Sequence, residues 1–237
     1  CSPEAGYRVE ALIVTDASGA RVAVASETAN RYTFRMPGSA VSIQAVFSPI
    51  QGQAVDGAQT FTDVAQSDWF YDAVQYVCAR GMMNGMGDGS FAPYTATSRG
   101  MIVTILYRMA GSPAVGACGF TDVAAGQYYT SAIAWAAEKG VVSGYGGGLF
   151  GPDDPITREQ MTLILQGYAR LSGKDVSARA DLSAYTDAGE ISGYAQESMS
   201  WARAVGLVNG TSETTLTPSG TATRAQAAAM LVRIYEK

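Results

Sequence analysis

The spacing of apolar residues changes along the chain near residue 50. Before that point, short segments at residues 7–14, 21–24, 31–34 and 41–47 alternate apolar and polar positions, as half-buried strands do. Turn sequences separate these segments at residues 16–19 and 36–38. The pattern predicts a small β-module over residues 1–49 whose thin core is marginal alone, followed by a linker over residues 50–58.

After the linker, apolar residues recur three and four positions apart, which is the period of a helix. The first helix carries its apolar face over residues 70–78, with Ser67 as the expected N-cap and Gly81 as the stop. A second helix follows Ser98 and is apolar nearly all round over residues 101–107. Such a helix belongs inside a bundle, so the pattern predicts a mainly α-helical fold.

This two-helix unit occurs three times. Phe-Thr-Asp-Val at residues 61–64 returns at 120–123 and, in altered form, at 185–188. A loop that ends in proline follows each copy, and the distance from the aspartate to a later arginine is constant to within one residue. Motifs that recur in the same order and at the same spacing predict tandem repeats, here over residues 59–112, 113–175 and 176–237.

An arginine opens the second helix of every repeat, at Arg99, Arg158 and Arg224. In the second and third repeats it follows the threonine of a capping box, Thr-x-x-Gln. The helix dipole disfavours a cation at this position by about 0.3–1 kcal/mol, so an anion nearby is indicated. Two anions fit: a ligand carboxylate held by the guanidinium fork, or the aspartate of the same repeat in a structural ion pair. Those aspartates are Asp63, Asp122 and Asp187, which also suit a cap or turn role.

Aromatic and glycine positions offer further candidates. The three repeats have an aromatic residue at the same position, at the start of the first helix: Trp69, Tyr128 and Tyr194. Stacking on a sugar ring and filling the gap between repeats both fit that position. Trp135 and Trp201 are expected in the core. The loop glycines suit either close approach of the backbone to a ligand or a tight turn, and the candidates are Gly85, Gly87, Gly144 and Gly146.

Composition excludes several functions. The chain has no histidine, which removes Ser-His-Asp and Cys-His catalysis, and its net charge of −5 argues against nucleic acid as a partner. One aspartate repeated three times does not make the asymmetric carboxylate pair of a glycosidase. We therefore expect that the protein is not an enzyme and that it binds neither a cofactor nor a metal ion. Apolar runs are too short for membrane insertion, and a disulfide between Cys78 and Cys118 stays an open alternative.

The combined motif resembles the S-layer homology (SLH) domain, in three copies that cover about three quarters of the chain. The resemblance implies a pseudo-threefold helical prism in a secreted Gram-positive protein at the cell wall or S-layer surface. It also implies attachment to a peptidoglycan-linked secondary cell-wall polysaccharide, often pyruvylated, in grooves between repeats. Residues 1–49 resemble the end of a small extracellular bacterial β-repeat.

On this resemblance, Arg99 and Arg158 would hold the acidic substituent, Trp69 and Tyr128 would pack on sugar, and loop glycines would offer backbone amides. The third copy lacks the glycine-rich loop, and Met101, Gln160 and Gln226 stand where the family has Glu. Sites built on the first two copies are therefore favoured. Upstream domains of a larger protein are further expected partners. The alternative function is a protein–protein assembly or adhesin scaffold that binds no glycan.

Overall fold

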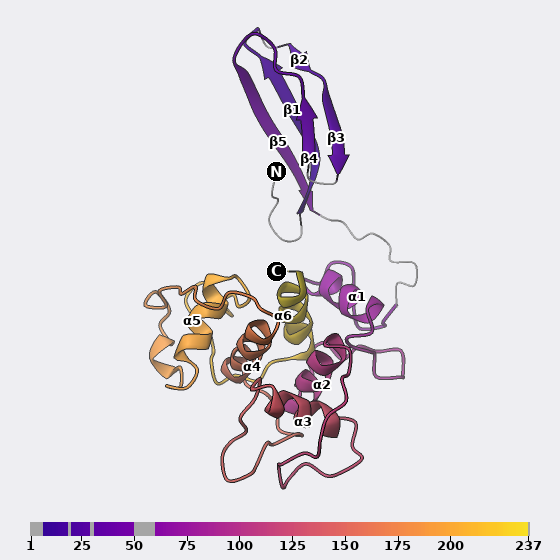
Figure 1. The fold of residues 1–237 in the computed structure, drawn as a ribbon, viewed down its shortest axis with the longest axis vertical. Helices are drawn as coiled ribbons and strands as arrows, with labels where there is room; N and C mark the ends of the chain where they lie inside the picture. Colours follow the sequence, from indigo (N-terminus) through magenta and orange to yellow (C-terminus); the bar gives the residue numbers. More distant parts are fainter. Residues whose placement is uncertain (1–6, 19, 29–30, 50–59, 237) are drawn as a thin grey trace. The chain divides into compact units, whose positions relative to one another are not determined.

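The computed structural model describes residues 7–18, 20–28, 31–49 and 60–236. The chain divides into two compact units, residues 1–56 and 57–237, and each is considered by itself (Figure 1). The predicted linker at residues 50–58 lies outside the described residues. Within the described part, no helix has the length and apolar character needed to cross a bilayer.

The first unit is a β-module of antiparallel strands, as the alternating pattern predicted. Its strands are β1 (Tyr7–Asp16), β2 (Arg21–Val22), β3 (Val24–Thr28), β4 (Arg31–Phe34) and β5 (Val41–Pro49). One sheet has the order β2-β1-β5, and β3 pairs with β4 in a separate hairpin. Val14 of β1 faces Val22 on one side and Ile43 on the other, and its side chain is buried.

The second unit is helical, which confirms the predicted fold class. Its helices are α1 (Tyr71–Ala79), α2 (Arg99–Met109), α3 (Thr130–Glu138), α4 (Arg158–Leu171), α5 (Gln196–Ala204) and α6 (Arg224–Glu236), with a short 3-10 helix η1 (Ala188–Glu190). The capping box predicted at Thr157 and Gln160 is present. The cap predicted at Ser67 is wrong. Residues 65–68 form a turn in which Asp68 accepts the Ala65 amide, so α1 begins only at Tyr71.

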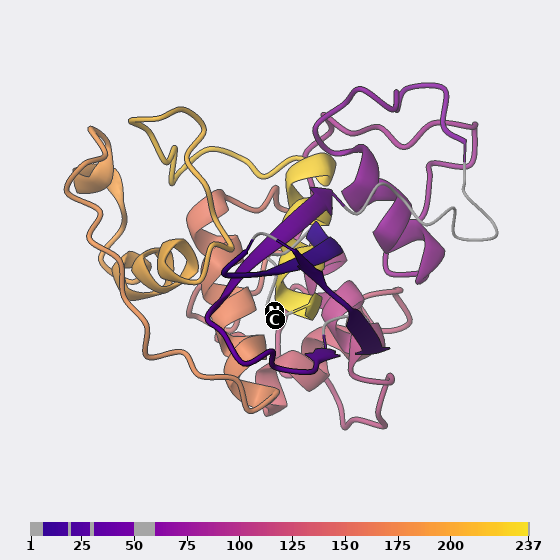
Figure 2. The same ribbon diagram turned by 90° about the horizontal axis from the view of Figure 1, so that it is seen from above.

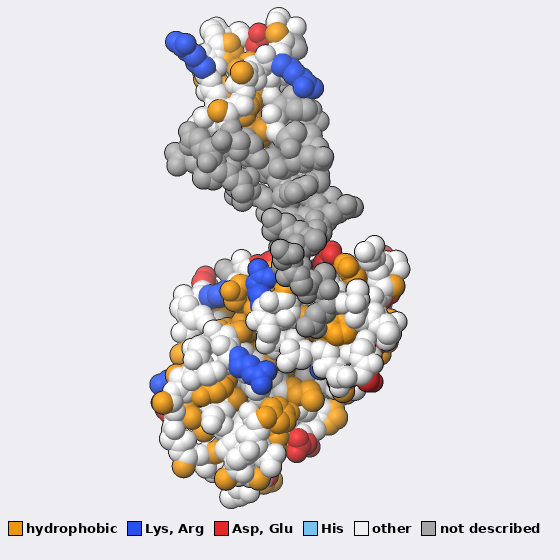
Figure 3. Space-filling model, turned by 90° about the vertical axis from the view of Figure 1, so that its right-hand side faces the viewer, with side chains coloured by type: hydrophobic (Ala, Val, Ile, Leu, Met, Phe, Trp, Pro, Cys, Tyr) orange, Lys and Arg blue, Asp and Glu red, His pale blue; other side chains and the backbone are white. Residues whose placement is uncertain are grey.

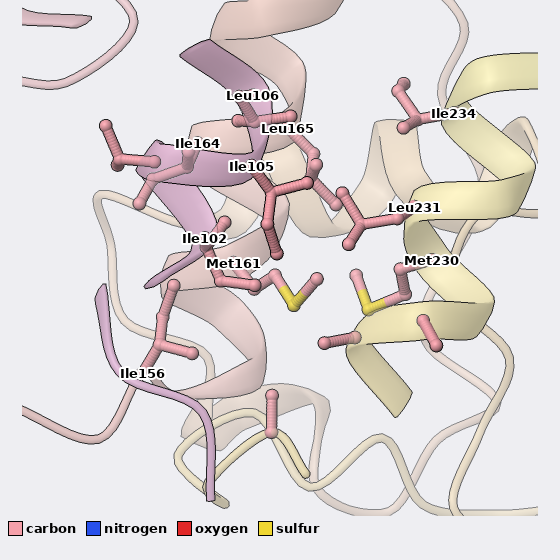
Figure 4. Close-up of a cluster of buried hydrophobic side chains, with 14 of the residues drawn as sticks. Ile102, Ile105, Leu106, Ile156, Met161, Ile164, Leu165, Met230, Leu231 and Ile234 are labelled. Carbon is pink, nitrogen blue, oxygen red and sulfur yellow. The ribbon is translucent and has the colours of Figure 1, made fainter. Parts of the chain in front are cut away.

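The longer helices α2, α4 and α6 supply the centre of the helical unit. Figure 4 shows their inward side chains meeting, among them Ile105, Leu165 and Leu231. Each shorter helix packs on the long helix of the preceding repeat: α3 on α2, α5 on α4 and α1 on α6. The last pair joins the third repeat to the first, so the arrangement closes on itself (Figures 1 and 2).

A cycle of backbone hydrogen bonds marks the centre of this closed arrangement. The amide of Thr97 donates to the carbonyl of Ala222 (3.0 Å), that of Ala222 to Ile156 (2.8 Å), and that of Ile156 to Thr97 (2.8 Å). These three residues lie two positions before α2, α4 and α6. The cycle therefore brings the beginnings of the three long helices together.

Buried side chains settle two further expectations. Trp135 and Trp201 are each 2% exposed, so the prediction that they belong to the core is confirmed. The disulfide that the sequence left open is not formed, because Cys78 and Cys118 are both free. Burial raises the pKa of the Cys78 thiol to about 11, which keeps it protonated at neutral pH.

Candidate functional site

Each of the three arginines reaches across to the loop of the next repeat. The Nε atoms of Arg99, Arg158 and Arg224 donate to the carbonyl oxygens of Phe150 (2.9 Å), Leu216 (2.8 Å) and Phe91 (2.8 Å), respectively. The residues are only 5–7% exposed. Burial lowers the pKa of all three guanidinium groups, and nearby aspartates partly offset that effect. The arginines thus connect successive repeats through neutral acceptors.

The repeated aspartates shape the loops of their own repeats. Both carboxylate oxygens of Asp63 accept backbone amides, from Phe91 and Ala92, each at 2.8 Å. Asp122 and Asp187 bind the equivalent amide pairs. Burial acts to raise the pKa of Asp122, but the amide hydrogen bonds outweigh it and the pKa is lowered. The turn role that the sequence suggested for these residues is present in all three repeats.

The ion pair between an arginine and the aspartate of its own repeat, one of the two alternatives that the sequence left open, is not formed among the described residues. Arg99 interacts electrostatically with Asp154 and Asp122, which both belong to the following repeat. Arg158 interacts in the same way with Asp187 of the third repeat, and Arg224 with Asp63 of the first. In the part of the chain that the structure describes, ion pairs within 4.0 Å join Lys139 to Glu138 and Arg179 to Glu197. The offset by one repeat follows from the cyclic packing of the helices.

Arg99 differs from the other two arginines in the hydrogen bonding of its terminal guanidinium nitrogens. A terminal nitrogen of Arg158 donates to the Asn209 carbonyl (3.0 Å), and one of Arg224 donates to the Asn84 carbonyl (2.6 Å). Both terminal nitrogens of Arg99 have no hydrogen-bond partner among the described residues. The Tyr145 ring instead lies 4.3 Å from its Cζ atom. Arg99 therefore keeps a complete two-nitrogen fork for an outside acceptor.

Two tyrosines lie near Arg99. Tyr145 and Tyr194 are 50% and 54% exposed, and both interact electrostatically with Arg99. The Gln160 side chain lies near both phenols, and its oxygen accepts the Thr157 amide (3.2 Å) in the capping box. We call the group formed by Arg99, Tyr145, Gln160 and Tyr194 the Arg99 site. It combines a buried cation with exposed aromatic rings and an amide.

Glu159 holds one side of the Arg99 site in place. Its carboxylate is buried and accepts hydrogen bonds from the Tyr194 hydroxyl (2.7 Å), the Ser192 hydroxyl (2.7 Å) and the Ser192 amide (3.0 Å). The equivalent positions in the other repeats are Gly100 and Ala225. This carboxylate thus makes the second-to-third repeat junction different from the other two.

Sequence reasoning missed Tyr145 and Glu159. A position-by-position comparison of the three repeats would have revealed both residues, because each stands where the other repeats have a different kind of side chain. Tyr145 stands in its loop where the other repeats have Met86 and Thr211. Glu159 follows its arginine where the others have a residue with no polar side chain.

The remaining predicted contact residues are divided between surface and packing positions. Trp69 and Tyr128 are exposed, at 64% and 55%, like Tyr194. Gly87 and Gly146 have φ near +90° and open space around them. Gly85 and Gly144 serve packing, because a Cβ there would lie 2.5–2.6 Å from the ring of Phe61 or Phe120.

The three repeats match a known domain family. The family model of the S-layer homology domain matches residues 60–100, 119–162 and 184–228, more than half of the chain. The chain is 29% identical to an amylopullulanase of Thermoanaerobacterium thermosulfurigenes over 79% of its length, and 30% identical to the exoglucanase XynX of Acetivibrio thermocellus over 75%. It is also 30% identical, over 72%, to the surface-layer 125 kDa protein of Lysinibacillus sphaericus.

The shared region is a small part of each relative, since the chain spans 10%, 16% and 14% of these three proteins. Proteins named as glycosidases and proteins named as S-layer components therefore share a region that is similar in sequence to this chain. With three matched copies arranged in a closed helical ring, the chain belongs to the S-layer homology domain family, whose non-catalytic modules anchor proteins to the cell wall at the cell surface.

Proposed function

We propose that the helical unit binds a secondary cell-wall polysaccharide that carries carboxylate groups, such as pyruvate ketals, and that Arg99 makes the principal contact with the acid. The observation that carries this proposal is the free fork of Arg99, with both terminal nitrogens unpaired among the described residues. A carboxylate fits such a fork in a bidentate manner, which a single free nitrogen does not allow.

The surroundings of Arg99 support a sugar acid over a free ion. Tyr145 and Tyr194 expose about half of their surface, so their rings are available to the apolar face of a sugar. Gln160 lies near both phenols, and its amide nitrogen is a hydrogen-bond donor for sugar hydroxyl groups.

The equivalent positions in the other repeats have lesser roles in this proposal. In Arg158 and in Arg224, one terminal nitrogen donates to a backbone carbonyl, so only the other terminal nitrogen is left for a ligand. Trp69 and Tyr128 correspond to Tyr194, and we propose that they pack on further sugars of the same polymer. Asp63, Asp122 and Asp187 contribute indirectly by shaping the loops, and Gly87 and Gly146 leave the loop tips open. Any upstream domains would be the cargo that the module holds on the wall.

The test is co-sedimentation with Gram-positive sacculi, before and after the non-peptidoglycan polymer is stripped. Arg99→Gln should lower the affinity for intact sacculi about tenfold or more, since one bidentate charged contact is lost. Arg108→Gln is the matched control, because it removes the same charge from an exposed position of α2.

Three results would contradict the proposal. Binding that survives stripping would assign the module to peptidoglycan itself. Equal binding by the two variants would remove Arg99 from the site. Absence of binding to intact sacculi would favour the protein-assembly function.

A further inference from the structure

The β-module has a long edge strand whose outer side is open. Strand β5 pairs with β1, and the sheet order β2-β1-β5 places no described strand beyond it. Figure 1 shows β5 along one side of the unit. Alternate residues of an edge strand direct their amides and carbonyls away from the sheet. β5 therefore offers a row of backbone groups to which another strand can bind.

The lack of charge distinguishes β5 from the other strands. β1, β2, β3 and β4 each contain a charged residue, and β2, the opposite edge of the same sheet, begins with Arg21. The side of the unit on which β3 lies bears basic side chains among its described residues, as Figure 3 shows. The nine residues of β5 include no charged residue, and proline is only the last of them. Charges and prolines are what keeps edge strands from pairing, and β5 lacks both before its final residue.

The geometry of β5 is also regular. The register of the β1–β5 pair shifts between Val9 and Ala11, so the extra residue, Glu10, belongs to β1. A bulge on the edge strand itself would twist that edge away from a partner. The bulge therefore does not protect the outer side of β5.

One apolar row across the sheet ends on β5 without being covered. Val14 of β1 lies between Val22 of β2 and Ile43 of β5, so the three residues share one face of the sheet. Val14 is 1% exposed, whereas Ile43 is 55% exposed. Ile43 is at the end of the row, and a strand added beyond β5 would cover it.

A second copy of β5 fits this edge. Two identical strands can pair antiparallel about a twofold axis, and a pair centred on Ala45 lets all nine residues take part. This register places Ile43 opposite Phe47 of the second copy. Odd-numbered positions then pair with odd-numbered ones, and those from 41 to 49 are all apolar. Like charges do not meet, because the strand has none.

The size of this contact suits proteins that share one surface. A pair of nine-residue strands is a small interface, and small interfaces are weak between free molecules. Modules of this family anchor proteins to the cell wall, so copies on one wall are held close together. A high local concentration makes a weak contact effective.

We propose that β5 pairs antiparallel with β5 of a second copy of this chain, so that the two sheets join into one continuous sheet. The helical unit would then attach each copy to the wall, while the β-module connects neighbouring copies. The inference does not depend on the proposed function, because it needs no carbohydrate and no residue of the helical unit.

Sedimentation velocity of the purified chain over a range of concentrations tests the association. Wild type should shift from monomer towards dimer as the concentration rises. Ile43→Lys should stay monomeric where at least half of wild type is dimeric, because the joined sheet would bury the added charge. Thr33→Lys is the matched control and should associate like wild type. It adds the same charge at an exposed position of β4, a strand that already contains Arg31. Circular dichroism should show that all three proteins are folded alike.

Cross-linking tests the register. In a chain whose Cys1 and Cys118 are replaced by serine, Ala45→Cys should form a disulfide-linked dimer on mild oxidation. The register brings residue 45 of the two copies opposite each other, about 4.5–5.5 Å apart at Cα, which a disulfide spans. Cys78 can stay, because it is buried. Thr33→Cys in the same background is the control and should remain a monomer.

Three results would overturn the proposal. The first is a wild-type chain that stays monomeric at every concentration. The second is a dimer that Ile43→Lys leaves intact, which would place the contact elsewhere in the chain. The third is a cross-link that forms as readily in Thr33→Cys as in Ala45→Cys. Because none of these assays contains wall material, binding to sacculi stays a separate test of the proposed function.

Discussion

Replacing Arg158 by alanine should destabilise the helical unit substantially, although a cation at a helix N-terminus is unfavourable. The guanidinium donates to two carbonyls of the third repeat, at 2.8 and 3.0 Å, and the residue is 6% exposed. Hydrogen bonds to a charged donor contribute roughly 1.5–3 kcal/mol each, and the truncation leaves both carbonyls without this donor.

Two effects reduce that loss. Removing the cation relieves the helix-dipole penalty of about 0.3–1 kcal/mol. It also relieves the cost of burial that lowers the pKa of the guanidinium group. The net cost should be about 3 kcal/mol, from the hydrogen-bond range less these offsets. For a unit of this size, that cost lowers the melting temperature by about 6–12 °C.

The assay is thermal unfolding followed by circular dichroism, with Arg170→Ala as the control. Arg170 lies on the same helix but is exposed, so its removal should shift the melting temperature by no more than about 2 °C. If Arg158→Ala has the same melting temperature as the control variant, the two hydrogen bonds to carbonyls contribute nothing measurable to stability. The guanidinium would then be available to a ligand, and the role assigned to it as a link between repeats would be wrong.

Three further predictions concern single residues. Ala92→Gly should raise the free energy of unfolding in urea by about 0.5 kcal/mol, because Ala92 has φ +55° and its counterpart is Gly151; a loss would contradict this. Glu159→Ala should cost about 2–3 kcal/mol in the same assay, since three hydrogen bonds are lost, whereas an unchanged midpoint would exclude a structural role. The folded-state pKa of Asp122 is lowered, so its stabilisation is complete above the unfolded value near pH 4 and disappears as pH falls through the folded one. Asp122→Asn should therefore lose stability at neutral pH and show a weaker acid dependence than wild type.

Local features of the fold could be predicted from the sequence. Helix periods, caps and glycine stops act over a few residues, so the helices of the three repeats and the strands β1, β2, β4 and β5 were expected close to where they occur. The strand β3 was not predicted as a separate element. Gly81, Gly140 and Gly206 end their helices with φ of +64° to +68°, as glycine permits. The start of α1 was misplaced, because a serine in a capping pattern does not reveal that Asp68 already closes a turn.

Which residues meet at the candidate site was decided by the tertiary structure. The residues at the start of each long helix were visible in the sequence, but their partners lie 51 to 140 positions away along the chain. No local pattern records that each repeat docks on the preceding one, or that the third closes on the first. For this reason the alternative of an arginine–aspartate ion pair placed the two charges in the same repeat, whereas they come from successive repeats. The closed packing gives Arg158 and Arg224 a second carbonyl and leaves the fork of Arg99 free, because long-range contacts determine which donors are already occupied.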